Sequence, residues 1–142
     1  MGEALRLAHE AYSEGEVPVG CVIVKNGAII GAGRNRRERE QISLAHAEIE
    51  AIYSACRTLG SWRLDGCAMF VTLEPCPMCA GAIYNSRISE LYFGARDAQT
   101  GSCGSVINLF MENYGFSPKI YGGIRAEEAS ALMRDFFEKL RK

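Results

Sequence analysis

Apolar residues recur at helical spacing, three and four positions apart, in three long segments of the chain. The last of them is a clear amphipathic pattern, with apolar residues at 129, 132, 133, 136, 137 and 140. Glycine or proline follows each of the first two segments and stops the helix there. The pattern therefore predicts helices over residues 3–13, 45–59 and 127–140.

Short apolar runs between these segments indicate strands. The first two runs flank Asn26-Gly27, a pair typical of a tight hairpin turn because both residues tolerate positive φ. The third run stops before Pro75, and a fourth helix is expected over 77–85. The predicted strands cover residues 19–24, 28–32, 67–73, 90–94 and, at an edge, 119–121.

Polar or glycine-rich segments connect these elements. We predict loops over 34–44 and 96–104 and a short helix within 105–112. A helix, a hairpin and then strands alternating with helices predict an α/β fold, with a mixed sheet covered by helices on both faces. The 142 residues contain no repeat or linker, so we expect a single domain, 1–142.

Composition narrows the class of protein. Apolar residues make up 48% of the chain and charged residues 23%, as in ordinary globular proteins. No run approaches the roughly 20 apolar residues that a membrane span needs. The first ten residues carry charges among their apolar positions and lack a small-residue cleavage site, so they are not typical of a signal peptide. We therefore expect a cytoplasmic protein without a membrane partner.

The formal net charge of −1 does not favour binding to nucleic acid regardless of its sequence, because that affinity comes from neutralised phosphates. A nucleic-acid partner would have to meet a local basic patch. The alternative is that these charges are simply solvated beside nearby glutamates. The two candidate patches are Arg34, Arg36, Arg37 and Arg39, and the tail Lys139, Arg141 and Lys142.

Six cysteines in a chain that we expect to be cytoplasmic point to metal binding or burial rather than to disulfides. Cys21, Cys56 and Cys67 lie within apolar segments and are expected to be buried thiols. Cys76 and Cys79 are the one close pair. They belong to Pro75-Cys76-Pro77-Met78-Cys79, where Pro77 suits the first position of a helix.

Cysteines three apart on a helical turn point the same way, and the positive end of the helix favours their thiolates. Taken alone, this pair could equally be a redox pair or a coincidence. His46 changes the balance, because one imidazole and two thiolates make a three-ligand set for zinc. The fourth position is then left to water, as in catalytic zinc sites, unless Cys103 fills it.

Glu48 follows His46 by two residues. Positions two apart do not share a helix face, so both can reach one metal only from the first turn of the helix. A carboxylate there can take the proton of the activated water and pass it on. The alternative for Glu48 is a carboxylate that only stabilises the helix N-terminus.

The pattern H-x-E followed by P-C-x-x-C is typical of zinc nucleobase deaminases. Over nearly its whole length the chain resembles the bacterial tRNA adenosine deaminases, which convert the wobble adenosine of an anticodon to inosine. The runs that carry this resemblance are Gly15-Glu16-Val17-Pro18-Val19-Gly20, Asn35-Arg36-Arg37-Glu38, Gly60-Ser61-Trp62-Arg63-Leu64, residues 71–81 and Phe93-Gly94-Ala95-Arg96-Asp97.

The resemblance implies a three-layer α/β/α cytidine-deaminase fold with a central five-stranded sheet, one zinc per subunit, and a homodimer with composite active sites. It also implies that Asn35 hydrogen-bonds the flipped-out base and that Val17 and Leu73 wall the pocket. A tRNA anticodon stem-loop is the implied partner. The C-terminal helix, with Phe136 and Phe137, is similar to an element that contacts the anticodon loop, although core packing is the favoured role for at least one of these rings.

The chain departs from the family pattern at residues 42–44 and 116–118, which leaves the details of anticodon recognition open. Two other functions also stay open. One is a deaminase of free guanine or cytosine with the same zinc site. The other is a non-catalytic, zinc-folded RNA-binding module, against which an intact Glu48 argues.

Overall fold

A computed structural model describes residues 1–141 of the chain. Within them the helices are α1 (Gly2–Ser13), α2 (Arg37–Glu40), α3 (Ala47–Leu59), α4 (Pro77–Ser86) and α5 (Ala126–Leu140), with a single 3-10 turn, η1 (Leu109–Met111). The strands are β1 (Gly20–Lys25), β2 (Ala28–Arg34), β3 (Ala68–Leu73), β4 (Glu90–Ala95) and β5 (Lys119–Tyr121).

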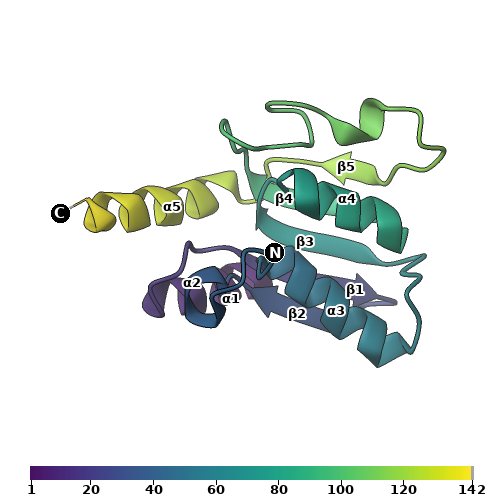
Figure 1. Ribbon diagram of the computed structural model, residues 1–142, viewed down its shortest axis with the longest axis horizontal. Helices are drawn as coiled ribbons and strands as arrows, with labels where there is room; N and C mark the ends of the chain where they lie inside the picture. Colours follow the sequence, from purple (N-terminus) through teal and green to yellow (C-terminus); the bar gives the residue numbers. More distant parts are fainter. Residues whose placement is uncertain (142) are drawn as a thin grey trace.

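The five strands of the described chain form one mixed sheet in the order β2-β1-β3-β4-β5 (Figure 1). β1 runs antiparallel to both β2 and β3, whereas β3, β4 and β5 are parallel. The hairpin between β1 and β2 turns at Asn26-Gly27, both at positive φ, as predicted. The parallel half of the sheet brings the carboxyl ends of β3 and β4 to one edge.

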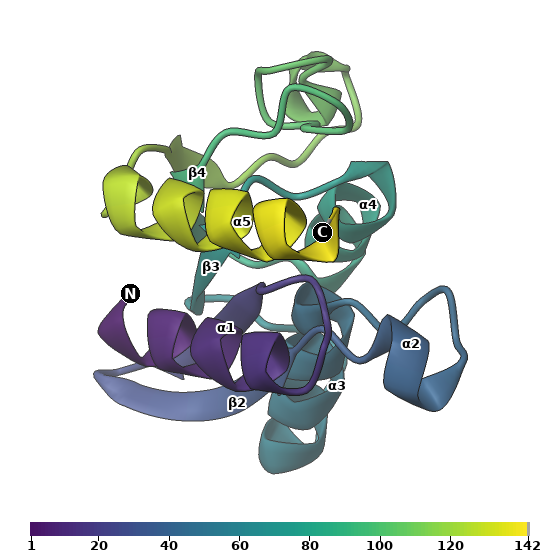
Figure 2. The ribbon, with the colours of Figure 1, turned by 90° about the vertical axis from the view of Figure 1, so that its left-hand side faces the viewer.

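Helices cover both faces of this sheet. α1 and α5 lie on one face, where α1 contacts β1 and α5 contacts β4 (Figure 2). α3 and α4 lie side by side on the other face, and α3 contacts β2 and β1. The larger core fills the space between the sheet and α3 and α4. The expected three-layer α/β/α fold with a central mixed sheet is confirmed.

Close packing of small residues fixes the position of α3. Ala47, Ala51 and Ala55 repeat every four residues along the helix and are fully buried. They lie over Gly31 and Gly33 of β2. A Cβ atom at Gly33 would come within 2.4 Å of the Ala47 carbonyl oxygen, so only glycine allows the helix backbone to approach so closely.

The thiols outside the Cys76–Cys79 pair behave largely as predicted. Cys21 and Cys67 are buried, and all six cysteines are free. Cys56 is only half-buried, so its predicted burial is wrong in degree; its Sγ lies 3.8 Å from the Trp62 carbonyl oxygen. Cys56 nevertheless packs against the larger core, near the carboxyl end of α3.

The predicted loop over 34–44 is wrong in part, because it contains the short helix α2. The reason is tertiary. The buried carboxylate of Glu16 accepts hydrogen bonds from the backbone N–H of Glu38 at 3.0 Å and of Arg39 at 2.7 Å. An acceptor at the amino end of a helix satisfies its unpaired N–H groups, and here it comes from a distant part of the chain.

The predicted short helix within 105–112 shrinks to the single turn η1. The Asn108 side chain accepts from the Phe110 N–H, and a backbone bridge joins Cys103 to Asn108, which closes the preceding residues into a tight loop. Val106, Ile107 and Met111 are exposed and bury no helical face. Only Phe110 of this segment packs against the larger core, so a longer helix there would gain little packing energy to offset its cost of nucleation.

No helix in residues 1–141 is long and apolar enough to cross a membrane. α3 and α4 both begin at the carboxyl edge of the parallel strands, and α5 runs outward past the same edge (Figure 1). This edge is therefore where strand ends, helix N-termini and α5 meet.

Replacing Gly33 by alanine tests the packing of α3 on β2. The added methyl group forces α3 off the sheet, and we expect the free energy of unfolding to fall by about 1–3 kcal/mol, measured by thermal or urea denaturation. Gly81→Ala is the matched control. Beyond the backbone of its own helix and its chain neighbours, nothing lies within 4 Å of a Cβ added at this glycine, so alanine should raise stability by about 0.5–1 kcal/mol. Equal effects of the two changes would contradict this account.

Candidate active site

The predicted metal ligands come together at the N-termini of α3 and α4. His46 is the N-cap of α3 and Cys76 is the N-cap of α4, and both have extended backbone. Pro77 occupies the first position of α4, as predicted, and Cys79 lies in the same turn. An N-cap residue stands outside the helical spiral, so its side chain can turn toward a point that the first turn also faces.

The spacing of the ligand atoms fits a tetrahedral metal ion. His46 Nδ1 lies 3.6 Å from Cys76 Sγ and 3.5 Å from Cys79 Sγ. Zinc bonds of about 2.3 Å to sulfur and about 2.0 Å to nitrogen at the tetrahedral angle place those atoms about 3.5 Å apart. Among residues 1–141 these three are the one group close enough to hold an ion, and Cys103 is not part of it. The donor set thus fits zinc with one position left open.

Glu48 lies beside the ligands in the first turn of α3 and is 4% exposed. The N-cap position of His46 explains how residues two apart face the same point. Burial raises the pKa of the Glu48 carboxyl to about 7, against the opposing effect of a hydrogen bond to the backbone. A carboxyl whose pKa lies near neutral pH can both take up and release a proton.

The two thiols differ in their electrostatics. The hydrogen bond from Cys79 lowers the pKa of the Cys76 thiol to about 4, with a further contribution from His46. The same contact and burial raise the pKa of Cys79, which is the hydrogen-bond donor of the pair. The lowered pKa of Cys76 favours its thiolate, the form in which cysteine binds metals.

A cleft of about 670 Å³ opens over this group. Asn35, Val17 and Leu73, the predicted substrate-binding residues, all line it together with His46 and Glu48. The backbone holds Asn35 in place: its N–H donates to the Val19 carbonyl at 3.1 Å, and its side-chain amide donates to the Val17 carbonyl at 3.4 Å. Every predicted site residue thus lies in the cleft or, like Cys79, beneath it.

Other residues that line the cleft were not predicted from the sequence. Glu74, Asp97, Gln99 and Thr100 come directly after β3 and β4, and Glu16 precedes β1. A signal for the first four was present, since ligands of α/β proteins bind beyond the carboxyl ends of parallel strands. The polar residues after 67–73 and 90–94 could have been found by that rule. Glu16 gave no such signal.

The two candidate basic patches are only partly free to bind an anion. Arg34 and Arg39 both pair with Glu14, and Arg36 pairs with Glu50 and Glu40. Arg37 instead lines the cleft, as does Arg141 at the end of α5. Lys139 pairs with Asp135, and Lys142 lies outside the described residues.

The two rings of α5 have different surroundings. Phe136 is buried and packs edge-on against Tyr12 of α1, as expected for core packing. Phe137 is 38% exposed and lines the cleft with Met133 and Leu140. The divergent residues 42–44 lie beside a separate groove on α3, and Phe116 packs near Tyr84, so neither segment lines the cleft within the described chain.

A family model described as MafB19-like deaminase matches residues 1–141. The chain belongs to this deaminase family. It is 46% identical over 143 residues to a tRNA-specific adenosine deaminase of Bacillus subtilis (strain 168), a match that covers 100% of this chain and 89% of the relative. The resemblance to tRNA adenosine deaminases seen in the sequence is thus confirmed.

Solved structures agree with this placement of the deaminase. One, from a study of A-to-I editing by tRNA:A34 deaminases at the wobble position, is 40% identical with a TM-score of 0.88, covering 91% of this chain and 94% of its own. A guanine deaminase from Bacillus subtilis is 33% identical with a TM-score of 0.66, covering 99% and 90%. The fold is therefore shared with a free-base deaminase, and the likeness is greater to the tRNA deaminase.

Proposed function

We propose that this deaminase hydrolyses adenosine to inosine at the wobble position of a tRNA anticodon, in the cytoplasm. The observation that carries the proposal is the cleft itself, because the Glu48 carboxyl, the His46-Cys76-Cys79 group and the Asn35 amide all meet there. The reaction consumes one water and releases ammonia. The tRNA anticodon stem-loop is the partner.

Zinc is the ion that we propose for this site, one per chain. The ligand spacing and the two sulfur donors suit it, and two thiolates offset its charge near two helix N-termini. When bound, zinc acts as a Lewis acid that activates water at neutral pH. His46, Cys76 and Cys79 would hold it as its three protein ligands.

The chain's own residues then carry out the proton transfers. Glu48 takes a proton from the attacking water and delivers it to N1 of the purine, which makes C6 more electrophilic. It next moves a proton to the amino group, which leaves as ammonia. The Asn35 side chain hydrogen-bonds the base, while Val17 and Leu73 lie along its faces. Burial of Glu48 suits it to both proton transfers.

The rim of the cleft favours an RNA substrate over a free base. Phe137 and Leu140 expose apolar surface there, and Arg37 and Arg141 bring positive charge. Rings that stack on unpaired bases and guanidinium groups that bind phosphates are the usual contacts with single-stranded RNA loops. A free base would fill only the floor of the cleft and would use none of these groups.

Glu48→Gln keeps the shape of the side chain and removes the carboxylate that accepts the proton. We expect kcat on an anticodon stem-loop with adenine at the wobble position to fall by about 10³-fold or more, with zinc retained. Inosine is measured by sequencing, where it reads as guanosine. Glu127→Gln, the same change at an exposed residue of α5, should leave turnover intact.

Near-normal inosine formation by the Glu48→Gln variant would refute the role of this residue. Faster ammonia release from free guanine or cytosine than from the stem-loop would identify a free-base deaminase instead. Binding of the stem-loop by the unaltered protein without any inosine would identify the non-catalytic RNA-binding module.

His46→Ala removes one of three ligands and leaves the two thiols. We expect the zinc content after dialysis to drop from about one per chain to well below it, measured by elemental analysis, and activity to drop with it. His9→Ala is the control, because His9 is exposed on α1 and has no part in the site. A full complement of zinc in the His46→Ala protein would contradict the ligand set.

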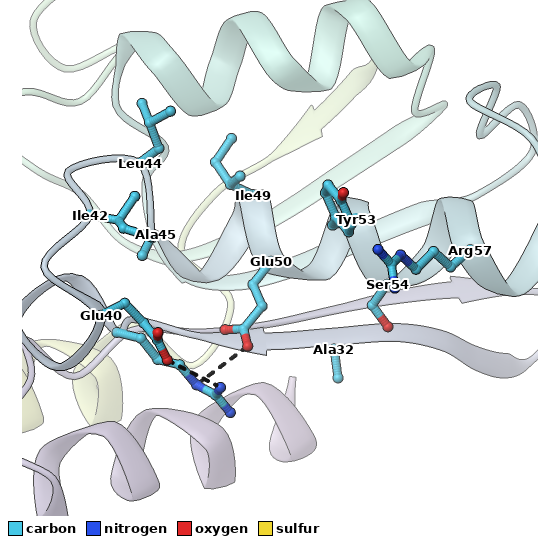
Figure 3. A pocket seen from close by; sticks show the side chains of 11 residues that line it. Ala32, Glu40, Ile42, Leu44, Ala45, Ile49, Glu50, Tyr53, Ser54 and Arg57 are labelled. Atoms are coloured by element: carbon cyan, nitrogen blue, oxygen red, sulfur yellow. Dashed lines mark ion pairs between the residues drawn. The ribbon is translucent and has the colours of Figure 1, made fainter.

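A second groove, on the outer side of α3, supports the expected homodimer (Figure 3). Ile42, Leu44 and Tyr53 each expose half or more of their surface there. Charges differ between the ends of the groove. Near the start of α3, Arg36 pairs with both Glu40 and Glu50, so this end carries a net charge of −1. Near the end of α3, Arg57 lies over the Tyr53 ring and makes that end positive.

We propose that a second copy of the chain covers this groove. Two copies of α3 that pair antiparallel about a twofold axis bring the acidic end of each against Arg57 of the other, so the surface is self-complementary. Burial of the exposed apolar side chains supplies the main driving force.

Tyr53→Glu puts a charge in the middle of the groove. Sedimentation should show a dimer for the unaltered protein and a monomer for this variant at micromolar concentration, because the new carboxylate removes apolar contact and draws Arg57 of its own helix away from the acidic end of the other copy. Ile29→Glu, at an exposed apolar residue outside the groove, should stay dimeric. A dimer that survives Tyr53→Glu would mean that another face pairs.

A further inference from the structure

Glu74 is a buried carboxylate with no part in the proposed proton transfers. It lies between the end of β3 and Pro75-Cys76 and is 2% exposed. A buried charge is costly unless it is hydrogen-bonded, so the hydrogen-bond partners of Glu74 indicate its role. Burial alone would raise its pKa, but hydrogen bonds from Ser105 and from backbone N–H groups hold the pKa below its ordinary value.

All of these hydrogen bonds come from one segment, residues 97–105. The backbone N–H groups of Asp97, Cys103 and Ser105 each donate to the carboxylate at 3.0 Å, and the Ser105 hydroxyl donates as well. Both oxygens accept. The carboxylate therefore binds the two ends of this segment at a single point.

Two further contacts hold the segment close to the turn that carries Cys76. The Ser102 N–H donates to the Pro75 carbonyl at 2.9 Å. Gly101 passes so near that a Cβ there would lie 2.5 Å from Glu74 Oε1. The absence of a side chain at 101 thus allows the carboxylate to lie inside the curve of the loop.

The same segment forms a wall of the cleft through Asp97, Gln99 and Thr100. Its tip is shaped locally, because Asp97 Oδ1 accepts from the N–H groups of Gln99 at 2.9 Å and Thr100 at 3.3 Å. Local bonds cannot decide where this tip stands relative to the metal ligands. Glu74 fixes that position, because it stands two residues before the proposed ligand Cys76 and its carboxylate is hydrogen-bonded to residues 97–105.

We propose that Glu74 is a positioning residue that holds residues 97–105 as the substrate-side wall of the cleft, so that Gln99 and Thr100 meet the RNA. The inference rests on the proposed function. The Glu74 carboxylate accepts its hydrogen bonds from residues 97–105 and not from His46, Cys79 or Glu48, so we expect it to act on binding of the stem-loop and not on the proton transfers.

Glu74→Gln tests this, because the amide keeps the size and loses the charge that four donors share. We expect KM for the stem-loop to rise about tenfold or more, as for the loss of a charge-assisted hydrogen bond, with kcat within about threefold and zinc content unchanged. Hydrogen–deuterium exchange of the free protein should speed up in residues 97–105 and stay unchanged in α3.

Ser105→Ala tests the same contact if the Glu74 variant does not fold, because Ser105 is exposed and the change removes only its hydroxyl. It should raise KM in the same direction and by less, whereas Ser117→Ala, away from the cleft, should not. The double variant should show less than the product of the two effects, since they share one hydrogen bond.

Three outcomes would overturn the proposal. They are unchanged exchange in residues 97–105, a loss of kcat with KM intact, or a loss of zinc in a folded Glu74→Gln protein. Failure of the proposed function is a separate result, seen as the absence of inosine with the unaltered protein. The exchange measurement then still decides whether Glu74 holds the loop.

Discussion

The site depends on the meeting of two helix N-termini at the carboxyl edge of the parallel strands. Each helix begins with an N-cap residue in extended backbone, and those residues are His46 and Cys76. Because an N-cap lies off the helical spiral, His46 and Glu48 can face one point although they are two residues apart. The positive ends of both helix dipoles favour thiolates there. They also oppose a cation, so two thiolates rather than neutral ligands suit a metal at this place.

Such a convergence tolerates little error in helix position. The seam of Ala47, Ala51 and Ala55 on Gly31 and Gly33 seats α3 with its backbone almost on the sheet. Loops cannot be fixed in this way, because they have few apolar side chains to bury. Two buried carboxylates hold the loops of the cleft by hydrogen bonds instead. Glu16 accepts from the start of α2, and Glu74 accepts from residues 97–105, so each joins a wall of the cleft to the body of the protein.

Apolar side chains of the helices either pack in the core or line an open cleft or groove. The periodicity of the sequence does not distinguish these two roles. Along α5 the same stripe buries Ala129 and Phe136 against the body and exposes Phe137 and Leu140 at the cleft. On α3 the inner face packs on β2 while Tyr53 and Ile49 line an open groove. A helix that is apolar on more than its core side has surface left for a ligand or for another copy of the chain.

The sequence by itself determined the order and type of the main elements, and it singled out His46, Cys76, Cys79 and Glu48, which the structure brings together. These features are local: periodicity, the Asn26-Gly27 turn, and cysteines spaced along one helical turn. Asn35, Val17 and Leu73 came from resemblance to a family, and the structure lines the cleft with them. Only the tertiary structure decided that residues 37–40 are helical and that 97–105 form a wall. In both cases the deciding acceptor, Glu16 or Glu74, lies more than twenty residues away in the chain, and hydrogen bonds across such distances leave no periodic trace in a sequence.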